Sequence, residues 1–289
     1  MQHTQDDVRN ALIRGTRTTR VARGTVALVA LASAAWSAPS AQVPDSLPFS
    51  VGEQLRFQLS VGKFGKVGRG TMTVQGPELV RGRRTLLLRF AVRGRVGPVA
   101  VESTTESWVD PAHLASLRFS KHERQLFRSR RERVEIFPED RRWSAQGERD
   151  DESGAPAPGA VASEGVGGAT PTDAPLDELS FIYFLRTLPL EEDATYSVSR
   201  HFHAERNPVV VTVLRRESID TPAGEFATIL VEMRVKDSRH YESEGVIRLN
   251  LSDDQWRIPV RIETSMPLVG KTVLLLTGRR AASGEVAPR

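Results

Sequence analysis

Hydrophobic and polar residues alternate along most of the chain after about residue 50. In residues 54–61 (QLRFQLSV) every second residue is apolar, which places one face of a strand in a core and the other in water. The alternation returns in residues 71–74 and 86–92, and a segment rich in threonine and serine follows at 102–109. The period of two predicts antiparallel strands throughout this half of the chain.

The second half of the chain shows the same rhythm, with turn residues such as Asn207-Pro208 and Ser252-Asp253-Asp254 between the apolar segments. We expect strands at residues 195–203, 209–219, 226–235, 244–251, 259–264 and 271–278. Strands at this spacing with short turns are typical of an antiparallel meander. The expected fold class is therefore all-β with one helix: a large curved antiparallel sheet or an open β-barrel, partly covered by the helix.

One segment, residues 175–188, follows helical spacing instead. We expect Asp173 to cap this helix and Pro189 to end it. Apolar side chains, including Phe181 and Phe184, lie on most of its surface, so the helix must be covered on most sides. It is expected to plug or line the mouth of the curved sheet.

Residues 144–175 interrupt the strand pattern. They are filled with glycine, alanine, proline, serine and acidic residues, and such a composition buries too little apolar surface to fold. We expect a flexible loop at 147–175 inside a single β domain spanning residues 42–280. A linker between two domains is the alternative. Residues 281–289 are expected to form a disordered tail.

The amino-terminal residues have the order of a secretory signal. Arginines come first, an uncharged apolar run follows at residues 24–36, and small residues come next, with cleavage expected after Ser40 or Ala41. The apolar run would reach only about 20 Å as a helix, which is short for a hydrocarbon core of about 30 Å. We therefore expect a signal peptide at 1–41 and an exported, periplasmic or extracellular body without a transmembrane segment. An uncleaved interfacial helix is the alternative.

Charge and cysteine content exclude several classes of function. The net charge is +4, of which residues 1–40 contribute +3 (five arginines and two aspartates), so the body carries +4 − 3 = +1. A nearly neutral body argues against nucleic acid as a partner held by bulk charge. The chain has no cysteine, which excludes disulfides, thiolate zinc sites, cysteine nucleophiles and a lipid-modified cysteine anchor.

Two groups of polar residues are candidates for chemistry. Arg130, Arg131 and Arg133 lie in residues 117–137, which we interpret as a charged hairpin; they form either a solvated face or an anion patch. His201 and His203 would share one face of a strand and could supply half a metal site. No third ligand has a supporting spacing, so neither a metal nor another cofactor is expected.

Four segments in order resemble the bacterial exported family called domain of unknown function 3108. They are VGEQLRFQL at residues 51–59, LDELSFIYFLR at 176–186, TPAGEF at 221–226 and LSDDQWRIPV at 251–260. The resemblance covers about residues 47–278. It implies an exported protein with a large curved antiparallel sheet, similar in shape to lipoprotein carriers. The family has no established activity, so the resemblance assigns no functional residues.

We therefore expect a non-catalytic binding module for a lipid or another hydrophobic ligand, held on the apolar inner face of the sheet. The expected lining or core residues are Leu55, Phe57, Leu59, Leu88, Phe90, Phe181, Phe184 and Trp256. Two alternatives remain open. The protein could act in envelope assembly, binding a protein partner through sheet edges and the basic hairpin, or it could be a metal-dependent hydrolase using His201 and His203.

Overall fold

The computed structural model describes residues 46–125, 128–150, 166–236, 244–266 and 270–280. The expected signal peptide, its cleavage site and the expected tail at 281–289 lie outside these residues. Fourteen described strands form one sheet: β1 (Gln54–Val61), β2 (Gly65–Val80), β3 (Arg83–Val96), β4 (Val99–Asp110), β5 (Ala115–Gln125), β6 (Arg128–Phe137), β7 (Arg142–Asp150), β8 (Val166–Ala169), β9 (Thr195–Val198), β10 (Val209–Thr221), β11 (Gly224–Lys236), β12 (Glu244–Ser252), β13 (Pro259–Met266) and β14 (Gly270–Arg280).

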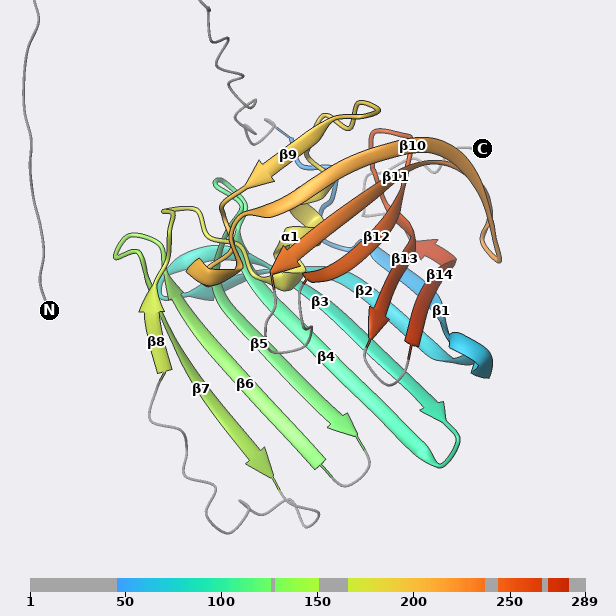
Figure 1. Ribbon diagram of the computed structural model, residues 1–289. Coiled ribbons are helices and arrows are strands. Elements are labelled where there is room, and N and C mark those ends of the chain that lie inside the picture. The colour runs from blue at the N-terminus through green and yellow to red at the C-terminus, as the bar shows by residue number, and fades with distance from the viewer. Residues whose placement is uncertain (1–45, 126–127, 151–165, 237–243, 267–269, 281–289) are drawn as a thin grey trace, which may run out of the picture. The chain divides into compact units, whose positions relative to one another are not determined.

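The sheet consists of two meanders that meet at its centre. Its strand order is β8-β7-β6-β5-β4-β3-β2-β1-β14-β13-β12-β11-β10-β9, and the strand pairs are antiparallel. The chain runs outward from β1 to the edge strand β8, crosses to the opposite edge at β9, and returns to β14 beside β1 (Figure 1). The expected all-β class with one helix is confirmed.

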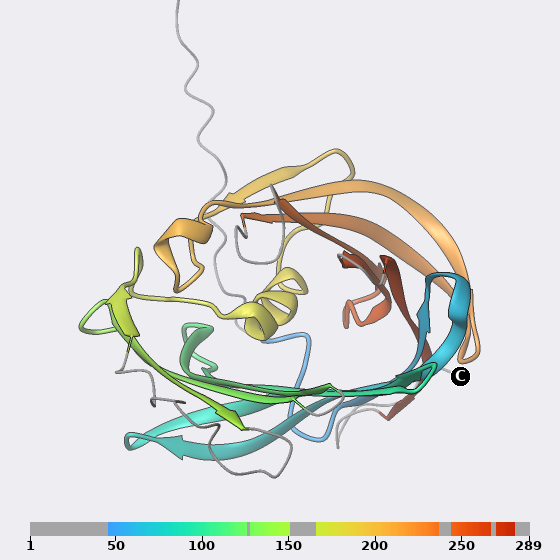
Figure 2. The ribbon, with the colours of Figure 1, turned by 60° about the horizontal axis from the view of Figure 1, so that its bottom comes forward.

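The sheet is strongly curved and remains open. Register shifts interrupt the pairing at several points, including Arg56/Phe57 in β1, Gln75/Glu78 in β2 and Val213/Arg215 in β10. Such bulges bend a strand and increase its local twist. Figure 2 shows the sheet curling around the helix α1 (Glu178–Leu185). The edge strands β8 and β9 are not paired with each other, which confirms the expected open, curved sheet.

The helix is shorter than the sequence pattern predicts. It begins after Asp177, not after Asp173, because the Asp177 carboxylate accepts the amides of Leu179 and Ser180, each at 2.9 Å. The Ser180 hydroxyl in turn binds the Asp177 amide, completing a capping box. Residues 175–176 bind other segments through backbone hydrogen bonds: the Pro175 carbonyl accepts the Ser116 amide, and Leu176 pairs with residues 200–202. No helix of the described residues is long and apolar enough to cross a bilayer.

The prediction of a flexible loop at 147–175 is wrong at both ends of this range, where the structure has strands. Strand β7 extends to Asp150, and Val166–Ala169 forms β8, which pairs with β7 through Arg142–Ala145. Residues 151–165 lie outside the described part of the chain. Strand β8 was missed because its glycines suggested a loop. Glycine is needed at Gly167, since a Cβ there would lie 2.8 Å from the Trp143 carbonyl oxygen. This strand therefore needs glycine for close approach, although glycine is rare in most strands.

Buried side chains form two clusters. The main cluster joins α1 to the inner faces of β1–β4 and β9–β14, and it includes Leu55, Phe57, Leu88, Phe181 and Phe184. The edge cluster comprises Phe119, Val134, Ile136, Trp143 and Phe202, with Ala145 packed against it. The apolar residues predicted from the period of two thus point into the curve of the sheet, where α1 covers them.

Candidate functional site

The site is built around Arg186, the residue that ends α1. Its side chain is fully buried, and its guanidinium forms a bidentate ion pair with Glu53 at 2.7 and 2.8 Å. Nη2 also donates to the Pro48 carbonyl at 2.7 Å, and both Nε and Nη2 donate to the Trp256 carbonyl. One side chain therefore fastens the helix to the segment that leads into β1 and to the β12–β13 turn.

Aromatic rings enclose this guanidinium. The Phe49 and Tyr183 ring centroids lie 5.2 and 5.3 Å from the Arg186 Cζ atom, and the two rings meet edge to face at 4.9 Å. Burial raises the pKa of Tyr183, and the nearby Glu53 carboxylate raises it further. A buried ion pair is stabilising only when its remaining donors are satisfied. Arg186 meets that condition through the Pro48 and Trp256 carbonyls.

A second element of the site is the turn between β12 and β13. The Asp254 Oδ1 atom accepts the amides of Trp256 and Arg257, at 2.9 and 3.0 Å, and the Ser252 hydroxyl at 2.7 Å. The Ser252 hydroxyl oxygen also accepts the Ile258 amide. These bonds are turn chemistry of the kind that aspartate and serine supply. They hold Trp256 and Arg257 at a fixed place beside Arg186.

A cavity of about 490 Å³ opens where these elements meet. It is lined by Ser46, Leu47, Pro48, Arg186, Thr187, Leu188, Pro189, Gln255, Trp256 and Arg257. Ligand pockets typically occupy about 300–1,000 Å³ and combine apolar walls with a few polar groups. The cavity matches that description, with leucine, proline and tryptophan beside two arginines.

A third arginine lies next to the cavity. The Arg279 guanidinium lies 5.7 Å from the Trp256 ring centroid. Burial lowers the pKa of Arg279 and the neighbouring Arg186 lowers it further, while Asp254 and Glu53 act in the opposite direction. The positive groups around the cavity are therefore Arg186, Arg257 and Arg279.

Of the eight residues expected to line a ligand site, Trp256 alone lines this cavity. Leu55, Phe57, Leu59, Leu88, Phe181 and Phe184 are buried in the main cluster, and Phe90 is half-buried against it. Phe57 and Phe90 pack over Gly70, where an added Cβ would lie 2.8 Å from Leu274 Cδ2 and 3.3 Å from the Phe90 ring. The other seven residues therefore belong to the packed core and do not line the cavity.

The structure divides the three candidate arginines of β6 between two faces of the sheet. Arg130 points to the same side as the buried Val134 and Ile136, whereas Arg131 and Arg133 point to the other side. Arg130 lies 3.8 Å from Glu132, and Arg133 donates to Glu135 at 3.2 Å. The three guanidiniums do not converge on one place. The expected charged hairpin itself is present as β5 and β6.

His201 and His203 lie outside the strand that was expected to carry them, because β9 ends at Val198. Asn207 holds their loop: its side chain accepts the His201 amide and donates to the His201 and His203 carbonyls, each at 2.9 Å. Both imidazoles are buried, with ring centroids 5.8 Å apart, and His201 Nδ1 accepts the His203 amide. No group of three or more metal-ligating side chains occurs within the described residues.

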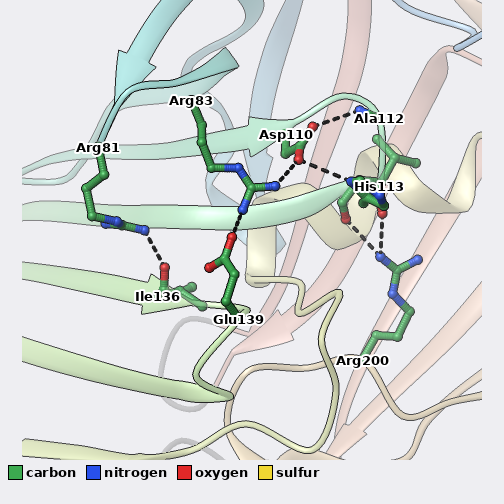
Figure 3. Close-up of polar contacts among 9 residues, drawn as sticks. Arg81, Arg83, Asp110, Ala112, His113, Ile136, Glu139 and Arg200 are labelled. Carbon is green, nitrogen blue, oxygen red and sulfur yellow. Dashed lines mark hydrogen bonds and ion pairs between the residues drawn. The ribbon is translucent and has the colours of Figure 1, made fainter.

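A separate polar network joins turns at one end of the sheet (Figure 3). Arg83 forms ion pairs with both Asp110 and Glu139. Arg200 donates to the His113 and Leu114 carbonyls, and burial lowers its pKa to about 10. Burial alone would raise the pKa of Asp110, but the Ala112 amide, His113 and Arg83 hold it below its ordinary value. Because these groups bind one another, the network fastens the turns together.

Glu53, Arg186 and Arg257 were not among the site residues predicted from the sequence. The sequence did mark these positions, because each of the three residues lies within one of the segments that carry the family resemblance. Glu53 belongs to residues 51–59, Arg186 ends residues 176–186, and Arg257 lies in residues 251–260. The fold brings these three segments together at the cavity. The fourth segment, 221–226, forms the β10–β11 turn.

The chain belongs to the protein family of unknown function DUF3108, whose family model matches residues 56–277. No curated protein matches the chain. Among solved structures, it is similar to a β-barrel-like protein with a domain of unknown function DUF1849 from Brucella abortus. That similarity has a TM-score of 0.50 at 11% identity, and it covers 81% of this chain and 99% of that one.

Two further solved structures are more distant. One is described as an exported protein with a YmcC-like fold from Bacteroides fragilis, with a TM-score of 0.33, 8% identity, and coverage of 81% of this chain and 98% of that one. The other is described as a lipoprotein from Parabacteroides distasonis, with a TM-score of 0.33, 10% identity, and coverage of 81% and 97%. At 11% identity, the similarity to the Brucella abortus protein shows a β-barrel-like fold and assigns no activity.

Proposed function

We propose that this protein is an exported, non-catalytic binding protein of the cell envelope that holds a hydrophobic ligand in the cavity beside Arg186. The cavity of about 490 Å³ is the observation that supports this function most directly. Its apolar lining includes Leu47, Leu188 and Trp256. Removing the apolar part of a ligand from water against such a surface stabilises the complex by about 25 cal/mol per Å².

Charged side chains at the cavity are held by contacts within the protein, which favours binding over catalysis. Arg186 and Glu53 bind each other, and Asp254 is occupied by the turn that it stabilises. A nucleophile next to a base oriented by a third group is the usual sign of covalent catalysis. The residues that line the cavity hold no such arrangement. A wall of this kind reduces the ordering cost of binding, because few side chains must be immobilised.

The proposal is tested with a neutral hydrophobic probe, N-phenyl-1-naphthylamine, which becomes fluorescent in apolar surroundings. The mature wild-type protein should bind the probe saturably. The Gln255→Trp variant fills the cavity from its exposed rim. It should bind about tenfold more weakly, a change of about 1.4 kcal/mol.

The matched control is Gln75→Trp, which places the same side chain at an exposed position of β2 that does not line the cavity. This control should bind as the wild type does, and circular dichroism should show that both variants fold. Absence of saturable binding, or equal loss in both variants, would overturn the proposed function. Native mass spectrometry after incubation with total bacterial lipid then identifies the natural ligand.

A further inference from the structure

One arginine at the cavity has a buried hydrogen-bond donor that no described residue accepts. Arg257 lines the cavity, and its Nη1 atom is buried without a hydrogen-bond partner among the described residues. Arg186, on the same wall, differs in this respect, since it is saturated by Glu53, Pro48 and Trp256. A buried donor without a partner is costly for a folded protein and needs an explanation.

The backbone at Arg257 is strained as well. Its φ angle is +47°, in the left-handed region that residues other than glycine seldom adopt. Asp254 imposes this conformation by accepting the Trp256 and Arg257 amides. Strained residues held by their surroundings cluster at ligand sites, where the strain positions a side chain. In this protein the strained backbone places Arg257 at the cavity, next to the apolar ring of Trp256.

The charges around the cavity leave Arg257 available. Glu53 is committed to Arg186, and the Asp254 Oδ1 atom is committed to the turn. Burial and Glu191 raise the pKa of the neighbouring Tyr196, whereas Arg257 lowers it. Glu191 is exposed, and it forms no ion pair with Arg257. A guanidinium presents a planar fork of donors that fits a carboxylate or a phosphate.

We infer that the ligand is an anionic amphiphile: its apolar chain lies against Trp256 and Leu188, and Arg257 binds its carboxylate or phosphate group. This inference rests on the proposed function and adds the class of headgroup. Arg186 acts as a positioning residue, because it fixes the Trp256 carbonyl and thereby the turn that carries Arg257. Arg257 is the residue that selects the headgroup.

Four probes with the same twelve-carbon chain test the inference: dodecanoate, dodecyl phosphate, dodecyl maltoside and dodecyltrimethylammonium. Each is titrated below its critical micelle concentration into the mature protein, and calorimetry measures the affinity. The wild type should bind one or both anionic probes about tenfold to a hundredfold more tightly than the maltoside, and the cationic probe most weakly. The two anionic probes distinguish a carboxylate from a phosphate headgroup.

Three variants locate the preference. Arg257→Gln should abolish the preference by lowering the affinity for the anionic probes to that for the maltoside, and Arg257→Lys should retain most of it because the charge remains. The control Arg89→Gln removes an exposed arginine of β3, outside the cavity lining, and should behave as the wild type. Equal affinity for all four headgroups, or a preference that survives in Arg257→Gln, would overturn the inference and leave the proposed function standing. If none of the four probes binds, both fail.

Discussion

The two buried clusters show how one pattern of alternation produces different interiors. In the main cluster the inward positions remain apolar along whole strands, as Leu55, Phe57, Leu59 and Val61 do in β1. On β6 the inward positions change character: Ile136 and Val134 are fully buried, Glu132 is half-buried and Arg130 is exposed. Packing in the edge cluster therefore stops partway along its strands.

The polar groups of the two regions differ in the same way. The main cluster contains one saturated, fully buried ion pair, Arg186–Glu53. The edge region contains a group of partly exposed charges, in which Glu178 pairs with Arg206 at 2.6 Å and Lys121 pairs with Glu123 at 3.0 Å. Burial lowers the pKa of Lys121, but Glu178, Glu123 and Glu132 raise it above its ordinary value. We infer that the main cluster sets global stability and that the edge opens locally.

The largest expected effect comes from breaking the buried pair of the main cluster. Arg186→Gln leaves Glu53 as a charge that is only 3% exposed, and removal of one partner of such a pair costs about 3–5 kcal/mol. Urea denaturation should show this loss as a lower midpoint with an unchanged slope. The double variant Glu53→Gln/Arg186→Gln should lose less, because no buried charge remains.

The control for this prediction is Arg89→Gln, which breaks the exposed pair with Glu106, separated by 3.4 Å. Exposed pairs contribute about 0–1 kcal/mol, so the midpoint should barely change. If the two single variants were equally destabilised, the distinction between a saturated buried anchor and a surface pair would be wrong.

A second effect, of about 3 kcal/mol, concerns the helix cap that joins the two regions. Asp177 is fully buried, and burial raises its pKa from 3.8 to about 6, although the Ser107 hydroxyl and the Ser180 amide act in the opposite direction. The folded state therefore binds this proton more tightly than the unfolded state. The resulting contribution to stability is present below about pH 4 and is lost as pH rises through 6.

Asp177→Asn separates this effect from other titrations, because asparagine also caps a helix and carries no charge. The free energy of unfolding of the wild type, relative to Asp177→Asn, should increase by about 2 kcal/mol as pH falls from 7 to 4, because the unfolded state is still partly ionised at pH 4. Urea unfolding of both proteins across this range measures the difference. A difference that does not change with pH would contradict a raised pKa at Asp177.

The local patterns in the sequence were sufficient to predict most of the elements. Alternation placed the strands because the inward positions are apolar, and the Ser252-Asp253-Asp254 turn follows from side chains that bind their own backbone. The helix start was wrong because two aspartates, Asp173 and Asp177, could cap it. The partner of Asp177, the Ser107 hydroxyl, lies 70 residues away and has no local signature.

The candidate site depended on contacts that no local pattern reveals. Arg186 and Glu53 are separated by 133 residues, and they meet because α1 packs inside the curve of the sheet (Figure 2), beside the segment that leads into β1. Trp256 was predicted as one of the large apolar residues expected on the inner face of the sheet. Arg186 could have been noticed as a charge that closes an apolar helix. Successive side chains of a strand point to opposite faces, so Arg130 cannot share a face with Arg131 and Arg133. The prediction of a single arginine patch overlooked this alternation.

The smallest expected effect tests whether the two clusters are independent. Phe202 packs edge to face on Trp143 at 5.6 Å, and Phe202→Leu should cost about 1 kcal/mol. Because its neighbours belong to the edge cluster, hydrogen exchange should accelerate in β5–β7 and remain unchanged in β1 and β14. The matched variant Phe184→Leu, in the main cluster, should accelerate exchange across the whole sheet. If Phe202→Leu also accelerated exchange in β1 and β14, the sheet would unfold as one unit, and the edge would not be a separate region.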